Sequence, residues 1–139
     1  MKLTTKPHLY TWLSIPLILI LSIIGIEHNV DFQMHDTYFV MATIHLGIFY
    51  AFIMGIAGFL YWLMRNKKLI NWMTLFHLVS CIFIFMLILI IPVVFDKRDA
   101  FRIVNQLQFV MIGGLILSQV IFLINLVVSL IRNKKKDAS

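Results

Sequence analysis

Four long stretches of the chain are almost continuously apolar, and the segments between them are short and polar. The stretches run over residues 10–27, 39–64, 70–95 and 107–131. Because a helix of about 20 residues crosses roughly 30 Å of hydrocarbon, each stretch is long enough to span a membrane. The pattern predicts an all-α integral membrane protein: a four-helix bundle that forms one membrane domain over residues 1–139 and leaves no room for a soluble domain.

Two other interpretations of these stretches are disfavoured. They lack the two-residue alternation of outer-membrane barrel strands, and a helix pairs its own backbone groups where lipid cannot. The first stretch follows Lys2 and Lys6, as the apolar part of a signal peptide follows basic residues. However, "GIEHNVDF" after it contains no small-residue cleavage pattern. We therefore expect the first stretch to be a retained membrane span.

Composition agrees with this class of protein. The chain is 61% apolar and 13% charged, with a mean hydropathy of +0.95. A soluble domain is nearer half apolar and has about a quarter of its residues charged. The single cysteine, Cys81, lies inside the third stretch and cannot form a disulfide within the chain. We expect it to act as a small apolar residue in helix packing.

The basic residues predict an orientation. Nine of the twelve Lys and Arg lie in the N-terminal segment, in "RNKKLIN" or in the tail "RNKKKDAS", and three lie between the third and fourth stretches. Basic loops stay in the cytoplasm, so both termini should be cytoplasmic and the acidic loop "EHNVDFQMHDTY" should face outward. We interpret the net charge of +6 as topology signals and contacts with lipid headgroups rather than a nucleic-acid site. The expected location is the inner (plasma) membrane, crossed several times.

The outward loop contains candidate ligands for a divalent ion, His35 and Asp36. An ion such as magnesium could use both if water or another subunit supplied further oxygens. The alternative is a polar cap in which Asp36 or Thr37 serves as the N-cap of the second helix. Spacing alone favours the cap.

Two histidines lie within the predicted spans. His45 would lie roughly 13 Å deeper than His35 along a helix, and a neutral imidazole is a common ligand of haem iron. A hydrogen-bonded core histidine is the alternative. His77 begins the third span from the other side, on the order of 15 Å from His45 along the membrane normal. We therefore expect no haem clamp between these two within one chain, and an interfacial or hydrogen-bonded role for His77.

Small and amide side chains in the spans predict helix packing. Gly55 with Gly58 and Gly113 with Gly114 should let another helix approach closely. Amide side chains can join helices through hydrogen bonds, and the candidates are Asn105, Gln106, Gln108, Gln119 and Asn125. These features indicate packing and carry no catalytic signature.

The segment "HDTYFVMATIH", residues 35–45, resembles a signature of subunit I of the haem-copper oxidases, the catalytic subunit of cytochrome c oxidase. The family pattern, H-D-T-Y-Y-V-V-A-H-x-H, belongs to its tenth helix. Asp31 matches an Asp before the signature, His77 and Pro92 are spaced nearly as in the eleventh helix, and "DAFRIVN" is similar to the entry into the last helix. Nearly the whole chain therefore resembles the family's final four helices, whose direction agrees with the orientation expected from charge.

The resemblance implies roles for individual residues. His35 and Asp36 match the outer pair near the family's magnesium site and haem propionates. His45 matches an axial ligand of the low-spin electron-transfer haem. Thr43 stands where the family has the ligand of the high-spin haem, and threonine is not an ordinary ligand of haem iron. The implied cofactors are thus a low-spin haem and a divalent ion, without copper, because the copper ligands belong to earlier helices of the family.

Three functions fit these observations. The preferred one is a non-catalytic subunit or accessory protein of aerobic respiration, which contacts lipid and either other membrane subunits or a second copy of itself. The second is a haem-binding electron-transfer protein that uses His45 and an opposing histidine from another chain. The third is one piece of a split oxidase. Thr43 argues against the third, because the missing ligand falls inside the segment this chain would supply. We expect no reduction of dioxygen by this chain alone.

Overall fold

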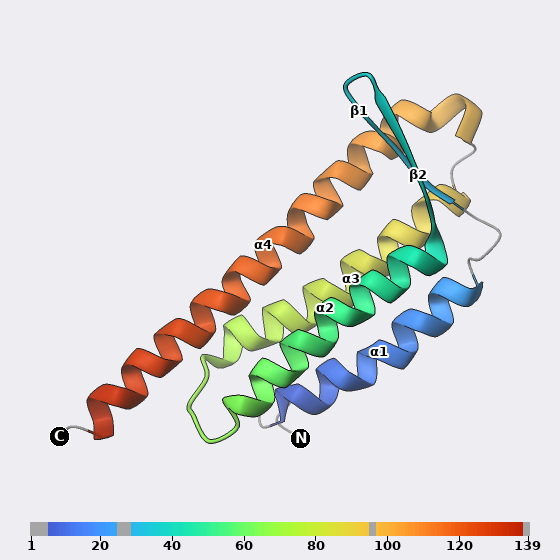
Figure 1. The fold of residues 1–139 in the computed structure, drawn as a ribbon. Coiled ribbons are helices and arrows are strands. Elements are labelled where there is room, and N and C mark those ends of the chain that lie inside the picture. The colour runs from blue at the N-terminus through green and yellow to red at the C-terminus, as the bar shows by residue number, and fades with distance from the viewer. Residues whose placement is uncertain (1–5, 25–28, 95–96, 138–139) are drawn as a thin grey trace.

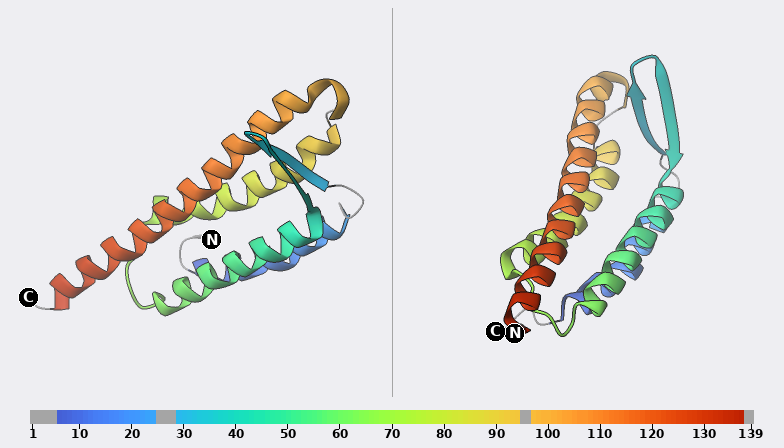
Figure 2. Two further views of the ribbon diagram at one scale, coloured as in Figure 1. Left: turned by 45° about the horizontal axis from the view of Figure 1, so that its top comes forward. Right: turned by 60° about the vertical axis from the view of Figure 1, so that its left-hand side comes forward.

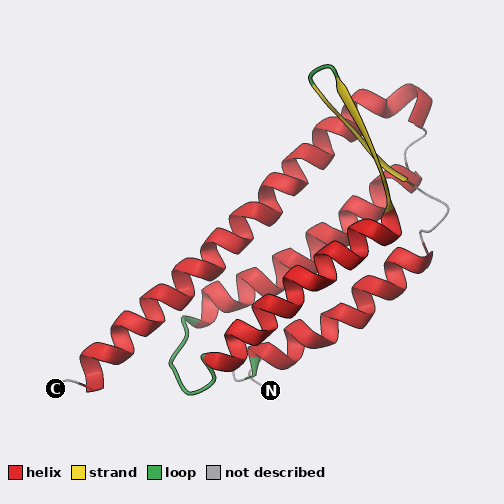
Figure 3. Cartoon of the chain, viewed as in Figure 1, coloured by secondary structure: helices red, strands yellow, loops and turns green. Residues whose placement is uncertain are grey.

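The computed structural model describes residues 6–24, 29–94 and 97–137, which form four helices and one β-hairpin (Figures 1 and 3). The elements in chain order are α1 (Pro7–Ile24), β1 (Asn29–Met34), β2 (Thr37–Ala42), α2 (Thr43–Leu63), α3 (Asn71–Val94) and α4 (Lys97–Asp137). Glu27 and His28, which belong to the predicted outward loop, lie outside the described residues.

Each of the four helices is long and apolar enough to cross a membrane, as the sequence predicts. Every span contains a long window of high hydropathy with few charged residues. α2, for example, has 21 residues, which corresponds to roughly 32 Å of helix. By the length and composition of its helices, the protein is therefore of the multi-pass membrane type.

The helices are arranged as two pairs that lie side by side (Figure 2). α1 packs along α2, α3 packs along α4, and α1 also contacts α3. Both ends of the described chain lie at the same end of the bundle as the α2–α3 connection, and the hairpin stands at the opposite end (Figure 1). This arrangement defines a hairpin end and a terminal end of the bundle.

Two buried clusters hold the pairs together. The cluster nearer the hairpin end joins α1, α2 and α3 through Ile18, Tyr50, Met54 and Phe85. The Tyr50 and Phe85 rings stack with their centroids 4.6 Å apart. The cluster nearer the terminal end joins α2, α3 and α4 and includes Tyr61, Leu78 and Phe122. Close packing of these large side chains gains dispersion contacts and fixes how the pairs meet.

Glycines allow α1 and α2 to lie unusually close together. A Cβ atom at Gly58 would collide with the Trp12 indole, and one at Gly47 would collide with the Ser22 side chain. A Cβ at Gly55 would make only an ordinary contact, and one at Gly113 would meet no heavy atom within 4 Å. The predicted packing role is thus confirmed for Gly58 and for Gly114, where a Cβ would lie 3.1 Å from Ile84 Cδ1 of α3. Gly113 has no such neighbour among the described residues, and the close approach at Gly47 was not predicted.

The β-hairpin departs from the prediction of an all-α chain. Residues 37–42 were assigned in part to the second span, but they pair antiparallel with β1, with Met34 opposite Thr37 and Asn29 opposite Ala42. The predicted cap at Asp36 or Thr37 is therefore wrong. The N-cap of α2 is Ala42, and no side chain bonds to that helix start. β-Branched and aromatic residues in "TYFVMA" favour a strand where apolar content alone suggested a helix.

Candidate functional site

His35 and Asp36 are the two turn residues at the tip of the hairpin. His35 has a positive φ of 55°, which a two-residue hairpin turn demands at its first position. His35 Nε2 lies 3.4 Å from Asp36 Oδ2, and both side chains are more than nine-tenths exposed. Among the described residues, no group of three His, Cys, Asp or Glu is placed to hold a metal ion. A divalent ion at this tip would take its remaining ligands from water or from another subunit.

The side-chain amide of Asn105 connects the hairpin to α4. Asn105 Oδ1 accepts a hydrogen bond from the Gln33 main-chain N–H at 2.8 Å, and Asn105 Nδ2 donates to the Gln33 carbonyl at 3.2 Å. On the same hairpin, desolvation and a hydrogen bond with Asp31 raise the pKa of the Tyr38 phenol. The contact between Asn105 and Gln33 holds strand β1 of the hairpin against α4.

His45 lies in the first turn of α2, and its side chain is exposed. The expected position 13 Å deeper than His35 along a helix is wrong, because residues 37–42 form β2. At about 3.3 Å per residue, this strand carries His35 roughly 20 Å beyond the start of α2. His45 therefore presents its imidazole outward near the hairpin end of the span rather than inside the bundle.

Thr43, two residues before His45, faces the opposite way. It is 2% exposed, and its Oγ1 donates a hydrogen bond of 3.4 Å to the Ser22 carbonyl of α1. Thr43 is therefore packed against α1.

His77 is fully buried between α2 and α4. Its Nδ1 lies 3.1 Å from the Tyr61 hydroxyl, and its ring stacks on Phe122 with centroids 4.6 Å apart. This confirms the expected hydrogen-bonded role. Tyr61 lies sixteen residues beyond His45 on α2, which is roughly 24 Å along the helix and on nearly the opposite face. The two imidazoles cannot reach one iron atom within this chain.

Cys81 is the meeting point of polar contacts in the middle of the bundle. Its Sγ lies 3.3 Å from Ser118 Oγ and accepts a hydrogen bond of 3.3 Å from Gln119 Nε2. Its carbonyl accepts a hydrogen bond from the Tyr50 hydroxyl at 3.1 Å. Cys81 is buried in the core cluster that joins α1, α2 and α3, which confirms the expected packing role, and its polar contacts come in addition. It joins three helices through polar contacts.

Asn125 attaches the α2–α3 connection to α4 at the terminal end of the bundle. Its Oδ1 accepts from the Ile70 N–H at 2.9 Å, and its Nδ2 lies 3.4 Å from the Ile70 carbonyl and 2.9 Å from Thr74 Oγ1. Ser129 Oγ donates to the Lys68 carbonyl at 2.7 Å. The predicted role of amides as helix connectors is thus confirmed for Asn125, although its main partner is backbone of a connecting segment.

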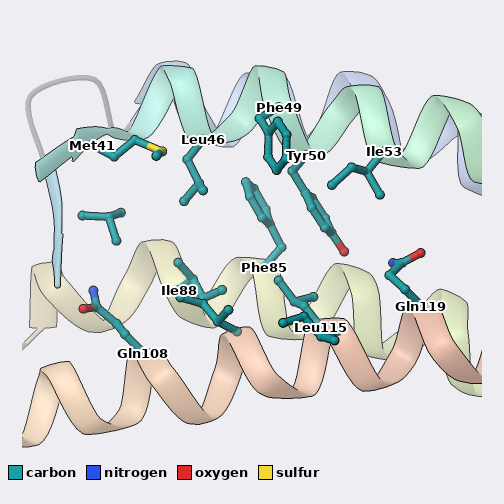
Figure 4. Close-up of a pocket in the computed structure, with 13 residues that line it drawn as sticks. Met41, Leu46, Phe49, Tyr50, Ile53, Phe85, Ile88, Gln108, Leu115 and Gln119 are labelled. Atoms are coloured by element: carbon teal, nitrogen blue, oxygen red, sulfur yellow. The ribbon is translucent and has the colours of Figure 1, made fainter. Parts of the chain in front are cut away.

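A cavity of about 240 Å³ lies beneath the hairpin, between α2 on one side and α3 with α4 on the other (Figure 4). Val30 and Met41 of the hairpin lie at one end, and Gln119 lies toward the other. Most of the lining is aliphatic or aromatic. Gln108, which is 1% exposed, lines the cavity, and both of its amide atoms lack a hydrogen-bond partner among the described residues. The sequence marks Gln108 only as a possible helix connector, because a cavity leaves no signal in the apolar pattern.

Comparisons of the chain with protein-family models, with curated proteins and with solved structures find no match.

Proposed function

We propose that the protein is a non-catalytic membrane subunit that works beside a respiratory oxidase of the haem-copper type. The resemblance of residues 35–45 to the oxidase signature supports the class of partner. The exposed imidazole of His45 indicates that the chain needs a protein partner at this point. Ionisable side chains in membrane spans ordinarily face protein or a water-filled cavity, because lipid offers them no hydrogen bonds. A neighbouring subunit against α2 would give His45 such a partner.

The face of α2 that carries His45 is suited to a protein partner. Phe49, Phe52 and Phe59 are 62%, 67% and 51% exposed, and they follow His45 at helical spacing. Aromatic side chains bury large areas on association and pack with defined geometry. The opposite face of α2 is already occupied by α1. The outward face of α2 is thus a surface on which a transmembrane helix of another subunit can pack.

The proposed orientation places both termini in the cytoplasm and the hairpin outside. Arg65, Lys67 and Lys68 support it, because these basic residues connect α2 and α3 at the terminal end of the bundle. In intact cells, a membrane-impermeant maleimide should label Asp36→Cys and leave Lys67→Cys unlabelled. The reverse labelling pattern would overturn this orientation.

Co-purification tests the proposed function. The tagged protein, extracted from native membranes in a mild detergent, should carry haem-copper oxidase subunits that are identified by mass spectrometry and by their haem and copper content. Phe49→Ala with Phe52→Ala should reduce the yield of these subunits several-fold. The matched pair Leu123→Ala with Val127→Ala, which are 53% and 55% exposed on α4, should leave it unchanged. Recovery of the chain alone, or only with a second copy of itself, would contradict the proposal.

Haem binding in electron transfer is the second candidate, and the outward imidazole of His45 favours it. Within the described residues the chain offers one imidazole on that face, so a six-coordinate haem would need a second histidine from another chain. Protein expressed with supplied haem should then show a low-spin bis-histidine spectrum. His45→Ala should abolish the spectrum, whereas His77→Ala should leave it intact. A colourless preparation would exclude this candidate.

A further inference from the structure

A second cavity lies at the terminal end of the bundle, where the connection between α2 and α3 meets the start of α1 (Figure 1). Its volume is about 270 Å³. Basic, amide and apolar side chains line it, among them Arg65, Lys67, Lys68, Asn71, Met64 and Leu69. In contrast to the apolar cavity beneath the hairpin, this one has polar groups at its surface.

The cavity presents positive charge without a neighbouring carboxylate. Arg65 and Lys68 are exposed, and no Asp or Glu is among the described residues that line the cavity. The sequence has no acidic residue between positions 37 and 95, so neither of the two helices that the connection joins supplies one. Basic side chains gathered at one place repel one another and create a potential that attracts anions. The chemistry of the lining therefore indicates an anionic ligand.

Contacts within the bundle hold the basic side chains in place before any ligand binds. Ser129 Oγ of α4 donates a hydrogen bond of 2.7 Å to the Lys68 carbonyl. The guanidinium carbon of Arg65 lies 5.0 Å from the centroid of the Trp62 ring, a cation–π contact that restrains the charged group. A guanidinium can bind a phosphate through two N–H groups at once. Because the site is preformed, binding loses less conformational entropy.

The position of the spans places this cavity at the boundary between hydrocarbon and water. The connection follows the span Thr43–Leu63 directly and precedes the span Asn71–Ile91. Trp62 and Trp72 stand at these two ends and are 37% and 64% exposed, as is typical of tryptophans at a membrane interface. Lipid headgroups lie just outside the hydrocarbon layer, at the level of this connection. A lipid phosphate can therefore reach the basic side chains while its acyl chains stay beside the spans.

We propose that this cavity binds the headgroup of one anionic phospholipid, such as phosphatidylglycerol, whose phosphate accepts hydrogen bonds from Arg65 and Lys68. The half-buried Leu69 contacts the glycerol part of the lipid. Phosphatidylcholine carries the same phosphate, but its choline cation would lie among basic side chains and be repelled. A free phosphate ion shares the chemistry of the phosphate and lacks the acyl chains. The proposal is independent of an oxidase partner, because it does not use the outward surface around His45.

Native mass spectrometry of the full chain in detergent micelles tests the proposal. The probes are phosphatidylglycerol and phosphatidylcholine with identical acyl chains. We expect one molecule of phosphatidylglycerol to stay bound at concentrations at which phosphatidylcholine does not, and equal retention of the two lipids would overturn the proposal. Inorganic phosphate in large molar excess should leave the lipid bound. Displacement of the lipid by phosphate would assign the cavity to a soluble anion and would also overturn the proposal.

Charge variants separate the cavity from the other basic residues at this end of the chain. Arg65→Gln with Lys68→Gln should weaken phosphatidylglycerol binding by about fivefold for each side chain, and so by roughly 25-fold together. The matched pair Lys134→Gln with Lys135→Gln removes the same charge from the end of α4 and should leave the affinity unchanged. Equal weakening by the two pairs would show a diffuse attraction to basic residues and contradict a defined site.

A neutral variant tests the shape of the cavity apart from its charge. Asn71 lines the cavity and is exposed, so Asn71→Trp should fill the space and block the headgroup while every charge remains. Asn66 is exposed on the same connection and is not among the lining residues, so the control Asn66→Trp should bind like the wild type. Thermal unfolding first shows that each variant is folded, and the charge variants decide the question should Asn71→Trp fail to fold. Unchanged binding by a folded Asn71→Trp would overturn the proposal.

Discussion

Asn105 and Asn125 of α4 make the same reciprocal pair of contacts with main chain at opposite ends of the bundle. Asn105 engages both the N–H and the carbonyl of Gln33 in the hairpin, and Asn125 does the same with Ile70 in the α2–α3 connection. The two asparagines are twenty residues apart, which is about 30 Å along the helix and equals the usual thickness of the hydrocarbon layer. α4 thus acts as a spacer that fixes the connecting segments at both ends.

The hairpin should loosen when Asn105 loses its amide. Asn105→Leu removes two hydrogen bonds, each worth about 1 kcal/mol, and leaves the main chain of Gln33 unpaired. We expect amide exchange across residues 29–42, followed by mass spectrometry, to become about thirtyfold faster, because about 1.4 kcal/mol corresponds to a factor of ten. Asn105→Asp should have an intermediate effect, because it keeps the acceptor for the Gln33 N–H and loses the donor. The control Gln106→Leu, at an exposed neighbour, should exchange like the wild type, and equal rates in all three variants would contradict this role.

Two glycines that look alike in the sequence should respond oppositely to alanine. A Cβ at Gly58 collides with the Trp12 ring, so Gly58→Ala should force α1 and α2 apart and cost about 1–3 kcal/mol of stability. A Cβ at Gly113 would meet no heavy atom within 4 Å, so Gly113→Ala should be neutral or stabilise the helix by up to about 1 kcal/mol. Thermal unfolding in detergent micelles measures both variants. A destabilised Gly113→Ala would mean that another chain packs against α4 at this point.

The sequence was sufficient to predict the number of long apolar helices and their approximate ends, because a long apolar stretch is the dominant requirement of a membrane helix. It could not reveal the hairpin. Residues 37–42 are apolar enough to extend the second span, and their assignment to β2 depends on pairing with β1, which is a tertiary contact. The missed hairpin also made the predicted depth of His45 wrong, because that depth was counted along a helix that in fact begins only at Thr43.

The sequence predicts properties of individual residues of the candidate site, but not which residues lie next to one another. His77 was expected to be hydrogen-bonded, and its contact with Tyr61 confirms this. The polar contacts of Cys81 were not expected, because a lone cysteine in an apolar run gives no hint of its neighbours. Gln108 and Gln119 look equivalent in the sequence, yet one amide is unpartnered among the described residues and the other donates to Cys81. Such a difference depends on side-chain direction within a three-dimensional cavity.

Gln108 and Gln119 should therefore differ when each is replaced by leucine. Gln108→Leu removes an unpaired buried amide and should raise stability by about 1 kcal/mol. Gln119→Leu removes the donor to Cys81 Sγ and should lower stability by a similar amount. Denaturant titration of delipidated protein in micelles measures the two variants side by side. A destabilised Gln108→Leu would show that the amide has a hydrogen-bond partner in the folded protein.

The hairpin should show a pH dependence at its Tyr38 phenol. Desolvation and Asp31 raise the pKa of Tyr38 above its ordinary value of 10, so the folded hairpin favours the neutral phenol. The resulting stabilisation is fully present below pH 10, and it is lost as the pH rises through the raised pKa. Asp31→Asn removes the repulsion of the phenolate and should lower this pKa. The ultraviolet absorbance of the phenolate, taken as the difference between the protein and its Tyr38→Phe variant, isolates the group among the four tyrosines. An identical titration of Tyr38 with and without the Asp31 carboxylate would show that the two side chains do not interact.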